Sequence, residues 1–180
     1  MGFVLGSLLQ QYVGGATAAP SQVNDHFDQA AQNASPDLLS QGLSALFRSD
    51  ATPPFGQLAG QLFGQSKPTQ QAGMLNQLIA GMGPGVLASL VGGAAGAGGI
   101  GAILGKLTGG GTATSISPAQ ASTLTPDQVQ VIAAHAEQHN PGIVDQISGF
   151  YAQHPTLVKT LGSAALAIAM AKMAEHQRSA

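Results

Sequence analysis

Two histidines one helical turn apart, His135 and His139, are the residues of this sequence best spaced to share a ligand. Their segment, His-Ala-Glu-Gln-His, resembles the zinc-binding pattern H-E-x-x-H, but Glu137 comes one position late. Because successive helical residues lie about 100° apart around the axis, Glu137 points away from the pair and cannot act as a base beside a metal. No third ligand is evident, although His154 could approach across a helical hairpin. We expect two polar histidines flanking an apolar helix face, with a metal site at His135 and His139 as an alternative.

Two glycine-rich patterns could in principle bind phosphate. Residues 96–101 match G-x-G-x-x-G, but a Rossmann unit also needs a preceding strand and an acidic residue about 20 positions later. The chain has no Asp or Glu between Asp50 and Asp127. Residues 101–108 resemble a P-loop, yet the spacing is one residue short and Leu107 replaces the magnesium-binding Ser or Thr. Neither pattern therefore predicts a nucleotide site.

The remaining composition also argues against catalysis and nucleic-acid binding. The acidic residues are spread out, no Gly-x-Ser-x-Gly elbow occurs, and the chain has no cysteine. Charged residues make up 8% of the chain, with a formal net charge of −2 and no basic cluster to contact a phosphate backbone. We predict a non-enzymatic protein with no cofactor, no small-molecule substrate and no nucleic-acid partner.

Proline preceded by a capping residue recurs along the chain and predicts helix starts. A side-chain oxygen at the cap satisfies a free backbone N–H, and proline fits the first helical turn. Two of these sites also carry the glutamine of a capping box. Since no alternating strand pattern accompanies them, the sequence predicts an all-α protein. The five sites are Ser35-Pro36, Thr52-Pro53, Ser117-Pro118, Thr125-Pro126 and Asn140-Pro141.

A glycine-dense stretch separates two groups of amphipathic segments. Several glycines in one helix are unfavourable, because each costs about 0.5–1 kcal/mol relative to alanine. We therefore predict an N-terminal helical domain at residues 1–91, a flexible linker at 92–117 and a C-terminal domain of three helices at 118–180.

Small residues recur every four positions through this stretch and would form one ridge if it were helical. Such ridges allow helices to approach closely in membranes, and residues 86–105 are uncharged and near the length that spans a bilayer. Glycine adds little hydrophobicity, and no basic cluster sets an orientation. A linker is favoured, with membrane or envelope association as the alternative. The ridge residues are Ser89, Gly93, Ala97, Gly101 and Gly105.

The last predicted helix, residues 155–176, is apolar on two sides. Leu157, Leu161 and Ile168 lie on one side, and a second row lies on the other. A helix this apolar is normally central in a bundle, so its surplus surface must meet the N-terminal segment, another chain or a membrane. We predict an interaction protein that binds an unknown protein partner or associates with itself. The second row comprises Leu166, Met170 and Met173.

The leucine-, glycine- and glutamine-rich segments 38–47 and 73–82 resemble YidB-like bacterial proteins, a helical family of unknown function. Residues 125–173, with Ser-Gly-Phe-Tyr-Ala-Gln-His-Pro at 148–155, look like the C-terminal part of small uncharacterised proteobacterial proteins. The resemblance implies a bacterial source and supplies no site residues. The first 13 residues lack the positive start of a signal peptide, so we expect a cytoplasmic location or one peripheral to the bacterial membrane.

Overall fold

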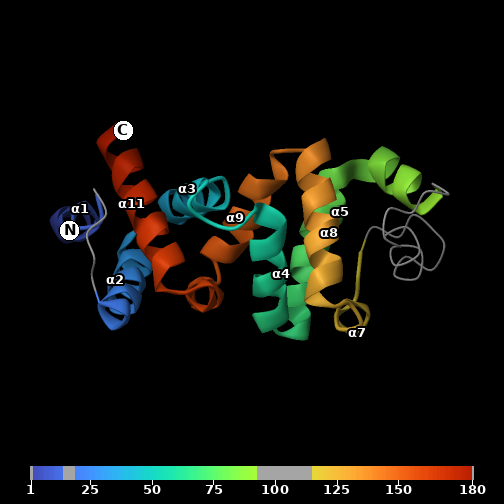
Figure 1. Cartoon of the computed structure of the whole chain (residues 1–180), viewed down its shortest axis with the longest axis horizontal. Helices are drawn as coiled ribbons and strands as arrows, with labels where there is room; N and C mark the ends of the chain where they lie inside the picture. The colour runs from blue at the N-terminus through green and yellow to red at the C-terminus, as the bar shows by residue number, and fades with distance from the viewer. Residues whose placement is uncertain (1, 14–18, 93–114, 180) are drawn as a thin grey trace. The chain divides into compact units, whose positions relative to one another are not determined.

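The computed structural model describes residues 2–13, 19–92 and 115–179, and their regular structure is entirely helical (Figure 1). The prediction of an all-α protein is confirmed. Residues 93–114 of the expected linker and four of the five ridge residues fall outside these ranges, whereas residues 92 and 115–117 of that linker are described. The helices are α1 (Gly2–Gln10), α2 (Pro20–Asn33), α3 (Pro36–Phe47), α4 (Phe55–Gln65), α5 (Pro68–Gly92), α7 (Pro118–Ala121), α8 (Pro126–His139), α9 (Ile143–Ala152), α10 (Pro155–Val158), the 3-10 turn η2 (Lys159–Leu161) and α11 (Ser163–Ser179).

Three of the five predicted helix starts are confirmed. Ser117 and Thr125 each accept a hydrogen bond from the backbone three residues on, and Gln120 and Gln128 reach back to the two cap N–H groups. Both are complete capping boxes, which satisfy two free donors at each helix start. Ser35 caps α3 by accepting from the N–H of Leu38.

The other two cap-proline sites, at Thr52 and Asn140, make different hydrogen bonds. Thr52 does not cap α4, which begins at Phe55; its hydroxyl donates to the carbonyl oxygens of Leu46 at 2.7 Å and Ser49 at 3.0 Å. Asn140 ends α8, and its side-chain oxygen accepts from the N–H of Gly142 at 3.1 Å. Neither side chain therefore makes the predicted bond to a backbone N–H three residues on.

The chain folds as two compact units that do not follow the domain boundaries expected from the sequence. Unit 1 combines Met1–Pro54 with Ser148–Ala180, and unit 2 is Phe55–Ile147. The expected N-terminal and C-terminal domains are therefore each divided between the two units. Stripes of apolar residues identify the buried face of each helix, but they do not specify which helix it meets.

In unit 1, helix α11 packs against α3, α2 and α1 (Figure 1). Gly42 of α3 lies directly over the Met173 side chain, where an added Cβ would collide with it. The two helices therefore approach closely at this point. Leu166, Met170 and Met173 each have an exposure of 0%. Their interpretation as an interaction surface is wrong, because the N-terminal helices of the same chain already cover them.

The predicted final helix is broken near its start. Gly162 has φ of +99°, a conformation that side chains other than glycine rarely adopt. The break separates α10 and η2 from α11. His154, the residue before α10, makes no side-chain cap bond, and its ring centre lies 4.9 Å from that of Phe150.

In unit 2, helix α4 lies against α8, and glycines allow the close approach. A Cβ at Gly56 would lie 2.7 Å from the carbonyl oxygen of Gln130, and a Cβ at Gly60 would lie 2.7 Å from that of Pro126. Real Cβ atoms do not come this close to backbone oxygens. Leu58, Leu62 and other apolar residues of α4 are buried alongside. Within the described residues, α4 therefore carries glycines that let a neighbouring helix approach closely.

Two asparagines fasten segments of unit 2 that are distant in sequence. The Asn76 side chain accepts from the N–H of Ile116 at 2.6 Å and donates to its carbonyl oxygen at 3.2 Å. Asn140 donates to the carbonyl oxygen of Gly81 at 2.8 Å. Side-chain amides can make such paired bonds because they carry both donor and acceptor groups. They hold Ile116, just before α7, and the end of α8 against α5.

Helix α5 contains a kink at Gly83, whose φ is +76°, directly before Pro84. Ser89 lies in the helix beyond this kink, whereas Gly93, Ala97, Gly101 and Gly105 lie outside the described residues. Within the described part of the chain, no helix has both the length and the apolar character needed to cross a bilayer.

Candidate binding surface

An open hollow of about 610 Å³ lies between the end of α3 and the last turns of α11 in unit 1. We call it the charged hollow. Cationic and anionic side chains border it together with two alanines. Its lining residues are Ala45, Arg48, Ser49, Asp50, Ala51, Lys172, Glu175 and His176.

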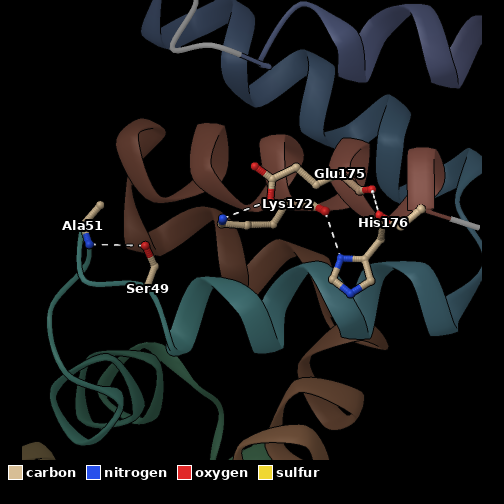
Figure 2. Close-up of polar contacts among 6 residues, drawn as sticks. Ser49, Ala51, Lys172, Glu175 and His176 are labelled. Atoms are coloured by element: carbon tan, nitrogen blue, oxygen red, sulfur yellow. Dashed lines mark hydrogen bonds and ion pairs between the residues drawn. The ribbon is translucent and has the colours of Figure 1, made fainter.

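The wall after α3 is held by local hydrogen bonds. The N–H of Arg48 closes the helix on carbonyl oxygens of its last turn, and the N–H of Ser49 donates to Leu46 at 3.1 Å. The hydroxyl of Ser49 accepts from the N–H of Ala51 at 3.2 Å (Figure 2). Together with the bonds donated by Thr52, these contacts satisfy two carbonyls that the helix end leaves free, those of Ser44 and Leu46. The side chains on this wall are therefore carried by an ordered turn.

The wall on α11 presents three ionisable side chains in one helical turn. Lys172 and Glu175 form an ion pair at 3.0 Å, with 36% and 56% of their side chains exposed. Nδ1 of His176 lies 3.1 Å from the carbonyl oxygen of Lys172, as Figure 2 shows. A carbonyl oxygen only accepts, so Nδ1 carries the proton in this bond. In the neutral ring, Nε2 then carries the lone pair and can accept from a ligand.

The charged hollow concentrates charge in a chain that has little of it. The chain has six Lys or Arg and eight Asp or Glu residues, and two of each kind border the hollow: Arg48, Lys172, Asp50 and Glu175. Two carry positive charge and two carry negative charge, so the surface has no dominant sign. Such a surface favours a partner that also presents both signs.

Sequence reasoning missed this surface. It assigned no role to any of the lining residues, although His176 is exposed on the last turns of α11. Two features of the sequence could have indicated it: the adjacent polar residues Arg48, Ser49 and Asp50, and the spacing of Lys172 and His176 by one helical turn. The two groups are more than 120 residues apart in sequence, and only the packing of α11 on α3 joins them.

The structure brings together the two histidines that the sequence singled out. The rings of His135 and His139 lie with centroids 6.1 Å apart and planes inclined by 37°. His139 is exposed, whereas Nδ1 of the half-buried His135 is buried with no hydrogen-bond partner. His154, the third ligand considered, belongs to unit 1 rather than unit 2. Among the described residues, no group of three or more His, Asp or Glu side chains is placed to hold a metal ion.

A second, smaller hollow of about 210 Å³ lies over α4 and α8 in unit 2. Three glutamines and one carboxylate border it, and it offers no cationic group. Its residues are Gln57, Gly60, Gln61, Pro126, Asp127 and Gln130.

Comparisons of the chain with models of protein families, with characterised proteins and with solved structures found no match. The resemblance to YidB-like proteins therefore stays a prediction. Function must be argued from the surface of the chain itself.

Proposed function

We propose that this chain is a non-enzymatic helical interaction protein that associates with a second copy of itself through the charged hollow. The observation that carries this proposal is the balance of charge there: Arg48 and Lys172 against Asp50 and Glu175. In a two-fold symmetric interface the same patch faces itself, so like charges repel unless cations of one copy lie opposite anions of the other. A patch with equal numbers of both meets this requirement.

The expected contact is polar and sensitive to salt. Exposed ion pairs contribute about 0–1 kcal/mol each, so four such groups support weak, reversible association rather than an obligate dimer. The shallow shape of the hollow agrees with a contact of this kind. Screening by salt should weaken it, because the Debye length falls to about 3 Å at 1 M.

Light scattering after size-exclusion chromatography, over a concentration series at low and high salt, tests this proposal. We expect a mass that rises with concentration at low salt only. Lys172→Glu should abolish the rise, and adding Glu175→Lys should restore part of it by exchanging the two charges. Lys67→Glu is the matched control, because Lys67 is an exposed lysine of unit 2. A mass that stays at the monomer value at every concentration, or that responds equally to both lysine substitutions, refutes it.

The alternative proposal is membrane or envelope association through residues 89–105. It is supported by the four-residue spacing of Ser89, Gly93, Ala97, Gly101 and Gly105. Liposome flotation of the full chain and of a variant lacking residues 86–105 separates the two proposals. Equal recovery of both proteins with the liposomes contradicts a role for the ridge.

A further inference from the structure

The end of α8 presents two imidazoles to the same region of space. His135 and His139 are one turn apart, and their ring centroids are separated by 6.1 Å. Metal–nitrogen bonds to histidine are about 2.0–2.1 Å long. Two imidazoles on opposite sides of one ion therefore have ring centres separated by two such bonds plus the distance from each nitrogen to its ring centre, which is similar to the separation found here.

We propose that His135 and His139 bind one late first-row divalent ion, of the class of Zn²⁺, Ni²⁺ or Cu²⁺. Neutral imidazole suits these ions, whereas Mg²⁺ and Ca²⁺ prefer oxygen ligands. With two protein ligands, water fills the other coordination positions. The site therefore exchanges its ion with solvent, unlike a closed four-ligand structural site.

The identity of the coordinating nitrogen on His135 follows from its surroundings. Its Nδ1 is buried and has no hydrogen-bond partner. Nε2 is the nitrogen left to coordinate, and no acceptor among the described residues orients the ring from behind. Metal-bound histidines normally have such an acceptor, and losing one typically costs 10–100-fold in affinity. The site is accordingly weaker than one with a complete second shell.

The position of the pair in α8 favours a cation. His139 is the last residue of the helix, where free carbonyl groups and the helix dipole concentrate negative potential. The helix contains no Lys or Arg that would repel an ion. His135 and His139 also span the last turn, so an ion held by both fastens that turn. The next residue, Asn140, joins the turn to Gly81 of α5.

Zinc titration of the full chain, followed on the ring signals of its five histidines and by calorimetry, tests the proposal. We expect one ion to shift the signals of His135 and His139 first, with reversal by a chelator. Because an ion that binds only the folded chain stabilises it, the midpoint of thermal unfolding should rise with zinc concentration.

Substitutions distinguish a shared ion from adventitious binding. His139→Gln removes an exposed ligand with little risk to folding. It should lower zinc affinity by at least about 10-fold, because a lost ligand costs no less than a lost second-shell partner. His135→Gln should do the same, with circular dichroism to check its fold. Gln138→Ala is the matched control at an exposed position of the same helix and should leave affinity unchanged. Unchanged affinity in His139→Gln, first shifts at His26, His154 or His176, or no shift near one equivalent of zinc overturns the proposal.

Discussion

The hydroxyl of Tyr12 and Nδ1 of His26 lie 2.6 Å apart, and this hydrogen bond joins the turn after α1 to α2. Tyr12 is only 3% exposed, and its ring meets that of His26 edge to face. Tyr12→Phe keeps the ring but leaves His26 without this partner. We expect a loss of about 1 kcal/mol in the free energy of unfolding, the usual net contribution of a neutral hydrogen bond. Urea unfolding measures it, and an unchanged midpoint contradicts the contact.

The same tyrosine should make stability depend on alkaline pH. Burial raises the pKa of the Tyr12 phenol above its ordinary value of 10.0, because the phenolate is poorly solvated there. The folded state therefore holds this proton more tightly than the unfolded state does. Its contribution is fully present below pH 10 and is lost as pH rises through the raised pKa. The free energy of unfolding should fall less steeply above pH 10 in Tyr12→Phe than in the original chain; parallel curves would refute this.

The approach of α4 to α8 predicts opposite effects for two alanine substitutions. A Cβ at Gly60 would lie 2.7 Å from a backbone oxygen of α8, so Gly60→Ala must push the helices apart. We expect it to destabilise the chain by about 1–3 kcal/mol, as overpacking does. At Gly85 nothing lies within 4 Å of an added Cβ. Gly85→Ala should instead stabilise the chain by about 0.4–1 kcal/mol through the unfolded state. Thermal unfolding of both variants decides the matter, and equal shifts in the same direction contradict the close approach.

The double hydrogen bond between Asn76 and Ile116 predicts that stability falls in steps as the two bonds are removed by substitution of Asn76. Asn76→Asp keeps the acceptor for the N–H of Ile116 but replaces the donor to its carbonyl oxygen, and Asn76→Ala removes both. Each hydrogen bond contributes about 0.5–1.5 kcal/mol to the free energy of unfolding. Asn76→Ala, which loses both bonds, should therefore lower it by up to twice as much as the loss of a single bond. Amide hydrogen exchange at Ile116 should accelerate most in Asn76→Ala. Equal protection in both variants would show that the acceptor bond does not hold this segment.

Local features of this fold were predictable because they depend on neighbouring residues. The capping boxes at Ser117 and Thr125 require only residues three positions apart. The buried stripes followed from helical periodicity, which places apolar side chains on one face. The break at Gly162 was missed because a single glycine between apolar segments does not distinguish a tolerated residue from a positive-φ turn.

Relationships between distant residues were not predictable in the same way. The charged hollow requires α11 to pack beside the end of α3, and the sequence contains no local signal for that pairing. The spacing of His135 and His139 did predict that their rings lie near each other. Whether a third group approaches them depends on tertiary packing, so the sequence left that question open.

The burial of Met170 distinguishes a core residue from an interaction residue. Its side chain has no exposed surface within unit 1, as is also true of Leu166. Met170→Ala should therefore destabilise the isolated chain by about 2–5 kcal/mol, because it removes buried carbon and leaves a cavity. Leu161→Ala, at a half-buried position in η2, is the control and should cost less. Had Met170 formed an external binding surface, truncation would weaken association and leave monomer stability nearly unchanged. Chemical unfolding at low protein concentration, where association is minimal, separates these outcomes.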